Sequence, residues 1–163
     1  MTTLRTDRLV LTPVTAADAA FVLELLNDPG WIANIGDRNV HTEDEARAYI
    51  ADRFTPNFWL KVADAGTGEP LGLCGVVPTR EGMEYPDLGY AFLARHSGKG
   101  YATEAAQAVL AHALGPLGHG RLAAITAPDN TPSQRVLLKI GFRHLGTRSL
   151  PGHGGDSAYF ETA

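Results

Sequence analysis

Residues 95–105 constrain the fold of this chain more than any other stretch, because they join two regular elements through a glycine-rich loop. An apolar, strand-like run at residues 88–94 precedes the loop, and an amphipathic helix begins within it. The first N–H groups of a helix have no intrahelical acceptor, and the helix dipole concentrates positive charge there. Gly98 and Gly100 lack a Cβ, so the backbone can adopt positive φ and approach a ligand closely. The sequence therefore predicts a phosphate-binding site at this helix start.

Two familiar phosphate-binding loops do not match this stretch. A P-loop needs Gly-x-x-x-x-Gly-Lys followed by Ser or Thr, whereas Lys99 is followed by Gly100. The dinucleotide fingerprint needs a small glycine where Thr103 stands, and an acidic residue about 20 positions later, where the chain has Gly120 and Arg121. The loop therefore needs another interpretation.

Residues 95–100 match the pattern Arg-x-x-Gly-x-Gly/Ala after a strand, and they resemble the acetyl-CoA pyrophosphate loop of the GNAT superfamily of N-acetyltransferases. Residues 88–93 are similar to the family strand that holds pantetheine, and residues 100–105 are similar to the helix start. Residues 130–142 resemble the later cofactor helix. The combination most resembles the ribosomal-protein-alanine N-acetyltransferase branch, and the resemblance covers almost the whole chain.

The resemblance implies that acetyl-CoA is the co-substrate. A glycine-rich turn without a ligand is the alternative for the loop alone, and the second motif at the right distance makes that alternative a minor one. By resemblance and charge, the expected acetyl-CoA-binding residues are Phe92, Leu93, Arg95, His96, Ser97, Gly98, Lys99, Gly100, Tyr101, Ala102, Asn130, Ser133 and Arg135. The six histidines and the single cysteine form no metal-ligand pattern, so no metal is expected.

The composition fits one globular domain, which we expect to span residues 1–163. Hydrophobic residues make up 44% of the chain and charged residues 20%, which is ordinary for a globular protein. The formal net charge of −4 disfavours a nucleic-acid-binding surface. The polar N-terminal residues and the lack of a long apolar run predict neither a secretory signal nor a membrane span. The single Cys74 fits a reducing cytoplasm, and we expect a monomer or a homodimer.

Hydrophobic periodicity, capping residues and turn residues predict the order of the elements. Strands are expected near residues 9–11, 58–63, 71–77, 88–93, 122–126, 142–148 and 157–161, with a turn at 151–156. Helices are expected within residues 16–26, 43–50, 101–113 and 132–140. The order β-α-α-β-β-β-α-β-α-β-β predicts an α/β (α+β) domain with a mixed central sheet flanked by helices. This order is that of the GNAT fold.

An acyl thioester bound at the loop favours direct attack by a neutral amine, so the protein needs a base and a donor for the leaving thiolate. Asp87 and Glu84 are the acids nearest the cofactor strand and are the candidate bases, with a plain turn aspartate as the alternative for Asp87. By resemblance, Ser133 is the candidate donor, with an ordinary helix-start serine as its alternative. Tyr90 and Tyr101 can also donate, and the sequence does not rank these donors.

The region between the first two helices lines the acceptor side in the family, which makes Trp31, Asn34 and Arg38 weak candidates for substrate contact. A core anchor at Trp31 and a solvated charge at Arg38 remain equally open. Residues 64–70 and the last two strands are also expected to frame the acceptor cleft. A protein α-amino group has a pKa near 7.7–8.0 and needs less help from a base than lysine, so the expected acceptor is a protein N-terminal or small-molecule amine. The alternative function is a catalytically silent CoA-binding or regulatory module.

Overall fold

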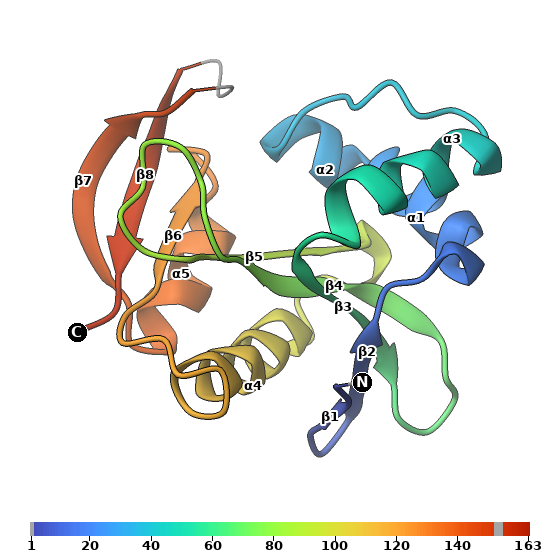
Figure 1. Ribbon diagram of the computed structural model, residues 1–163, viewed down its shortest axis with the longest axis horizontal. Coiled ribbons are helices and arrows are strands. Elements are labelled where there is room, and N and C mark those ends of the chain that lie inside the picture. Colours follow the sequence, from blue (N-terminus) through green and yellow to red (C-terminus); the bar gives the residue numbers. More distant parts are fainter. Residues whose placement is uncertain (1, 152–154) are drawn as a thin grey trace.

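Eight strands form one mixed sheet in the part of the chain that the structure, a computed structural model, describes: residues 2–151 and 155–163 (Figure 1). Their order across the sheet is β1-β2-β3-β4-β5-β6-β8-β7. The bounds are β1 (Leu4–Arg5), β2 (Leu9–Pro13), β3 (Phe58–Asp64), β4 (Pro70–Val77), β5 (Asp87–Phe92), β6 (Ala123–Thr126), β7 (Arg143–Ser149) and β8 (Asp156–Glu161). Residues 152–154 of the predicted turn lie outside the described residues.

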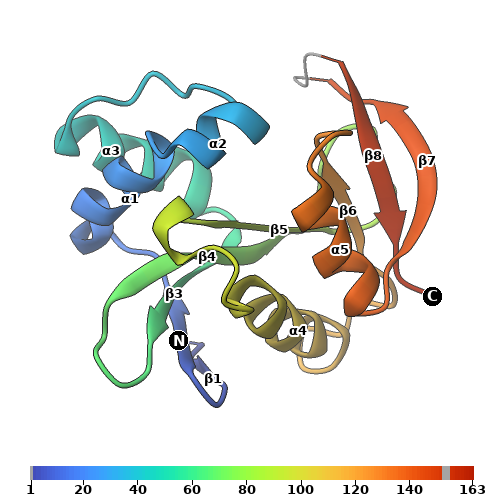
Figure 2. The same cartoon turned by 180° about the vertical axis from the view of Figure 1, so that it is seen from behind.

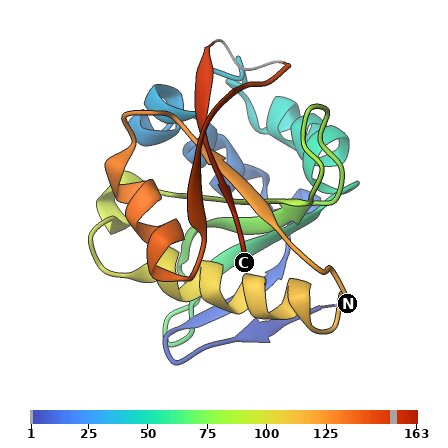
Figure 3. The ribbon, with the colours of Figure 1, turned by 90° about the vertical axis from the view of Figure 1, so that its left-hand side faces the viewer.

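Helices cover both faces of the sheet (Figures 1 and 3). The α-helices are α1 (Ala19–Leu26), α2 (Pro29–Asn34), α3 (Glu43–Tyr49), α4 (Tyr101–Leu114) and α5 (Thr131–Lys139). The 3₁₀-helices η1 (Ala16–Asp18) and η3 (Ala94–His96) and the π-helix η2 (Ile50–Phe54) are shorter. Helices α1 to α3 lie on one face, and α4 and α5 lie on the other. None of the helices in the described ranges has the length and apolar character needed to cross a bilayer.

The central strand β4 separates two hydrophobic cores. Cys74 and Val76 pack into the core that contains α4, whereas Leu73 packs into the core of α1 and α3. Successive side chains of a strand point to opposite faces, so a strand buried on both sides is apolar throughout. Helix α4 presents mainly alanines and Val109 to the sheet, which lets its backbone approach the strands closely. This packing fixes where α4 begins relative to β5.

The predicted fold class is confirmed, and besides the short helices η2 and η3 the structure adds two elements that the sequence analysis did not contain. One is β1, a two-residue edge strand. The other is α2, which occupies much of the segment expected to be irregular. The Asp28 carboxylate accepts a hydrogen bond from Gly30 N (3.0 Å), and Pro29 stands in the first turn. The residues that end α1 therefore also cap a new helix.

Strands β5 and β6 are parallel and diverge after a single residue pair. Asp87 lies opposite Ala123, and Ala123 N donates to the carbonyl of Pro86 (2.8 Å). In Figure 1, β5 runs across the view while β6 is steeply inclined to it. Their carboxyl ends lead to α4 and α5 respectively. The sheet therefore opens between the starts of these two helices.

Candidate functional site

A cleft of about 1350 Å³ lies where β5 and β6 diverge. Its walls come from α2 and the segment after it, from η2, from the connection between β4 and β5 (residues 78–86), and from the β7–β8 end of the sheet. Residues at the starts of α4 and α5 complete the lining. Figure 2 shows these two helices from behind. Segments far apart in the sequence thus meet around one opening.

The loop before α4 has the backbone expected of an anion site. Gly98 and Gly100 have φ values of 76° and 81°, in the left-handed region that favours glycine. A Cβ at Gly98 would meet no atom within 4 Å, whereas one at Gly100 would lie 3.3 Å from the Arg8 side chain. The first intrahelical bond of α4 runs from Glu104 N to Gly100 O (3.1 Å). The N–H groups just before Glu104 therefore lie at the cleft, where the helix dipole is positive.

Two basic side chains of the loop, Arg95 and His96, contact carboxylates. The Arg95 guanidinium lies 2.6 Å from the Glu24 carboxylate, and His96 Nε2 lies 2.9 Å from that of Glu69. Arg95 and the exposed Lys99 are not among the residues that line the cleft. The main chain, rather than these two cations, faces the opening.

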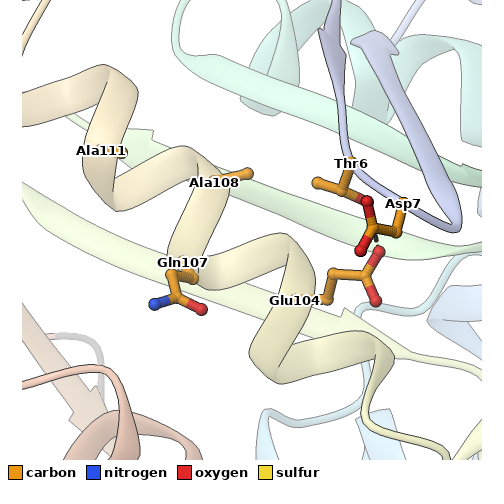
Figure 4. Close-up of a pocket in the computed structure, with 6 residues that line it drawn as sticks. All are labelled: Thr6, Asp7, Glu104, Gln107, Ala108 and Ala111. Carbon is orange, nitrogen blue, oxygen red and sulfur yellow. Dashed lines mark hydrogen bonds between the residues drawn. The ribbon is translucent and has the colours of Figure 1, made fainter.

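Arg8, on the N-terminal side of β2, holds this loop from outside the cleft. Its guanidinium donates to Lys99 O (2.9 Å), pairs with Glu104 (2.7 Å) and lies 4.7 Å from the centre of the Tyr101 ring. The Thr6 hydroxyl also donates to the Glu104 carboxylate, across a shallow pocket of about 420 Å³ (Figure 4). The contact between Thr6 and Glu104 was not predicted, because the two residues are 98 positions apart in the sequence.

Asp87 begins β5 and is buried in the cleft wall, with 5% of its surface exposed. Arg80 Nε donates to Oδ2 (2.8 Å), and Oδ1 has no hydrogen-bond partner among the described residues. Burial raises the pKa of Asp87 to about 6, although the neighbouring Arg80 opposes that shift. A carboxylate with this pKa is a stronger base than an exposed aspartate, and its unpartnered oxygen is itself buried from solvent.

Glu84, the other candidate base, lies outside the cleft lining. It is exposed, and Arg148 donates to its carboxylate (2.7 Å) and also contacts Gly82 O (3.3 Å). The hydrogen bond from Arg148 lowers the pKa of Glu84. This pair joins the 78–86 connection to β7, and the structure brings Asp87 but not Glu84 to the opening.

Tyr90 and Ser133 meet across the gap between β5 and α5. Tyr90 donates its hydroxyl hydrogen to Ser133 O (2.7 Å), and Ser133 Oγ donates to the Tyr90 hydroxyl oxygen (3.0 Å). Asn130 caps α5 by accepting from Ser133 N (3.4 Å). Burial raises the pKa of Tyr90, so its hydroxyl stays protonated at neutral pH. The two hydroxyl groups form a hydrogen-bonded pair inside the cleft.

Most of the predicted acetyl-CoA-binding residues line the cleft. Leu93 is the exception besides Arg95 and Lys99, because its side chain is fully buried in the core. The predicted residues that line the cleft are Phe92, His96, Ser97, Gly98, Gly100, Tyr101, Ala102, Asn130, Ser133 and Arg135.

The three weak candidates for substrate contact, Trp31, Asn34 and Arg38, also line the cleft. Trp31 is at the same time a core residue, 8% exposed, and its Nε1 has no partner among the described residues. The expected contribution of residues 64–70 is absent from the cleft lining; Glu69 instead contacts His96 beside the loop.

Several residues that line the cleft were not predicted from the sequence. Arg53, Trp59, Arg80 and Asp156 come from separate elements and belong to no recognisable motif. Cys74 is fully buried, and burial raises the pKa of its thiol, which fits a structural residue. Residues 2–151 and 155–163 contain no group of three or more His, Cys, Asp or Glu side chains placed to hold a metal ion.

Comparison with known proteins places the chain among proteins of known family. The family model described as "Acetyltransferase (GNAT) domain" matches residues 8–143. The chain is 34% identical over 157 residues to the uncharacterized protein YkkB of Bacillus subtilis, covering 90% of this chain and 88% of that protein.

Solved structures show the same architecture. A GNAT-family acetyltransferase from Bacillus anthracis superposes with a TM-score of 0.82 at 28% identity, covering 98% of this chain and 97% of that one. A ribosomal-protein-S5-alanine acetyltransferase from Vibrio fischeri also gives a TM-score of 0.82, covering 99% and 96%. Its identity is 16%, so that likeness concerns the fold alone.

Proposed function

Because the chain belongs to the GNAT acetyltransferase family, we propose that it transfers an acetyl group from acetyl-CoA to a primary amine by direct attack in a ternary complex. The acceptor is a protein N-terminal or a small-molecule amine. The observation that carries the proposal is one cleft that contains both an anion-binding helix start and a buried carboxylate with a free oxygen. The protein acts as a single domain in the cytoplasm, as a monomer or a homodimer.

The donor half of the cleft fits the diphosphate of CoA. The left-handed backbone at Gly98 and Gly100 leaves the main chain open to the cleft, and the first N–H groups of α4 supply neutral donors beside a positive dipole end. Arg135 on α5 adds a positive charge to the same half. When bound, acetyl-CoA supplies the activated acyl group, and the protein only has to position it.

The acceptor half must remove protons from the amine. An α-amino group with a pKa near 7.7–8.0 is mostly protonated at pH 7. Asp87 Oδ1 is buried, so it can accept one proton through a water molecule or after a local movement that exposes it, which leaves a neutral amine to attack the thioester carbonyl. The C–N bond forms as the C–S bond breaks. The nitrogen then loses its second proton, which protonates the leaving thiolate to give the CoA thiol. A buried base with a pKa of about 6 is sufficient for an α-amine.

We propose that the hydroxyl pair of Ser133 and Tyr90 stabilises the leaving thiolate when one hydroxyl hydrogen turns from its present acceptor toward the sulfur. Ser133→Ala should lower kcat by roughly tenfold, because a hydrogen bond to a charged group contributes on the order of 1.5–3 kcal/mol. The KM for acetyl-CoA should change little. Steady-state kinetics will measure both values, with Ser149→Ala on β7, outside the cleft lining, as the control. A rise in KM at unchanged kcat would contradict this function and assign Ser133 to cofactor binding.

The acetyltransferase proposal is tested by incubating the protein with acetyl-CoA and a panel of amines while following thiol release. We expect release with α-amines and small amines above the rate of hydrolysis. CoA binding without release for any amine would instead support the alternative, a catalytically silent CoA-binding or regulatory module. If CoA produces no thermal shift, both interpretations fail.

A further inference from the structure

The charge of the cleft walls is opposite in sign to that of the chain. The whole sequence has 18 Asp and Glu against 14 Lys and Arg. The cleft reverses this balance, because its charged lining residues are Arg38, Arg53, Arg80, Arg135, Asp87 and Asp156. The low-dielectric walls of a cleft focus the electrostatic field of an excess of positive charge, and this field attracts negatively charged ligands. The net excess is two positive charges, so the positions of the four arginines decide which ligand group each of them can meet.

Three of these arginines lie away from the CoA loop. Arg38 follows α2, Arg53 is in η2 and Arg80 is in the 78–86 connection, whereas Arg135 is on α5. In Figure 1 the α2 side and the 78–86 connection stand on opposite sides of the space above β5. The acceptor half of the cleft therefore has guanidinium groups on both walls.

Arg80 is only partly used by the protein. Its Nε binds Asp87, but its two terminal nitrogens have no partner among the described residues, and 33% of its side chain is exposed. A guanidinium can bind a second anionic group through this terminal edge. Arg80 can thus contact Asp87 and a ligand at the same time.

Arg38 is entirely free in the described part of the chain. It is exposed, lines the cleft and has no hydrogen bond or ion pair with residues 2–151 or 155–163. Arg53, by comparison, contacts Asp52 (3.0 Å) and lies over the Tyr49 ring. Arg38 is therefore the more available cation on the α2 side.

We propose that the acceptor amine also carries a carboxylate or phosphate group, which Arg80 and Arg38 attract from the two walls of the cleft while Asp87 serves as the base for the amine. This inference rests on the proposed acetyl transfer and specifies its substrate class. A substrate with both charges matches a cleft wall in which the Asp87 carboxylate lies beside the partly exposed guanidinium of Arg80. A polycationic amine would meet the same arginines with repulsion. Neutralising Arg80 with the substrate anion would also weaken its attraction for the Asp87 charge and so strengthen the base.

The test uses acceptor pairs that differ only in the anionic group. We would compare a tripeptide amide with Glu or Gln after its first residue, phosphoethanolamine with ethanolamine, and spermidine as a polycation. Each rate is expressed per neutral amine. The anionic member of a pair should have a kcat/KM roughly threefold to tenfold higher at low salt, and the advantage should shrink as salt screens it. If only the peptide pair shows the higher kcat/KM for its anionic member, the bound group is a carboxylate. If only the phosphoethanolamine pair shows it, the bound group is a phosphate. Equal values in both pairs, or a better rate with spermidine, would overturn the inference while leaving acetyl transfer intact.

Variants locate the anion site. Arg38→Ala should remove most of the preference for the anionic member, and Arg38→Lys should restore part of it. Arg47→Ala is the matched control, because Arg47 is exposed on α3, pairs with Asp44 and does not line the cleft. An equal loss in Arg38→Ala and Arg47→Ala would contradict the assignment.

Titration of the same pairs into the CoA-bound protein covers the case in which no amine releases thiol. Tighter binding of the anionic members would then support the anion site although acetyl transfer had failed. Equal binding would overturn the site as well. The two failures are therefore distinguishable.

Discussion

Asp87→Asn should lower kcat roughly 100-fold at pH 6–7 while the KM for acetyl-CoA stays within about threefold, as expected when a general base is removed. The substitution keeps an oxygen that can accept from Arg80 Nε, so the buried contact is preserved. Only the ability of the second oxygen to take a proton is lost. Steady-state kinetics with an α-amine, supported by thermal unfolding to confirm the fold, will measure the effect.

The pH dependence makes this result specific. In the native protein the rate should rise with pH as Asp87 ionises near its pKa of about 6. The pH–rate profile of the asparagine variant should lack the rise that belongs to this ionisation. The deficit should be largest near and below pH 6 and shrink toward pH 8, where an α-amine is neutral without help. Glu84→Gln is the control and should retain kcat within about twofold, since Glu84 is exposed and outside the cleft lining. A larger loss in Glu84→Gln than in Asp87→Asn would reverse the choice of base.

The same raised pKa predicts how folding stability changes with pH. The folded pKa of Asp87 is about 6, above the ordinary value of 3.8, so the native state binds the proton more tightly between these values. The contribution of this residue to the free energy of unfolding therefore falls as the pH rises from about 4 to 6, and Asp87→Asn should remove that slope.

Gly98→Val should raise the dissociation constant of CoA roughly 100-fold, equivalent to about 2.7 kcal/mol of binding free energy. Gly98 has φ of 76°, and a Cβ there meets no protein atom within 4 Å. The added side chain therefore occupies space that the diphosphate needs, and it strains the left-handed backbone that directs the loop N–H groups. Gly98 is a cleaner test than Gly100, where a Cβ would also press on Arg8. Calorimetric titration of the folded variant will measure the loss.

Gly118→Val is the matched control for this substitution. Gly118 has φ of 73°, has no atom within 4 Å of a built Cβ, and does not line the cleft. It should show a similar loss of folding stability, about 1–2 kcal/mol, without weaker CoA binding. Lys99→Ala should change the dissociation constant less than about threefold, because Lys99 is exposed and its charge is screened. Unchanged CoA affinity in Gly98→Val would contradict the loop assignment.

The sequence predicted those parts of the fold and site that depend on nearby residues. The loop before α4 could be located because glycine spacing, a preceding apolar run and a helical pattern are all local signals, and Gly98 and Gly100 do adopt positive φ. The order of strands and long helices followed from periodicity in the same way. Helix α2 was not predicted because it has only six residues and starts at an Asp28–Pro29 step, a pair that is also typical of the end of a preceding helix.

Only the tertiary structure decided which side chains act together. The burial of Asp87 and its free oxygen depend on β6 and the 78–86 connection, and the support of the loop by Arg8 joins residues 91 positions apart. The Arg95 side chain likewise donates a hydrogen bond to Glu24, which lies 71 positions earlier. This contact holds the Arg95 side chain away from the cleft, so the main chain of the loop faces the opening. Such contacts arise when the sheet brings distant segments together, and burial and charge pairing then set the pKa values. Local sequence patterns determine the elements and the backbone they can adopt, whereas the chemical properties of the site follow from long-range packing.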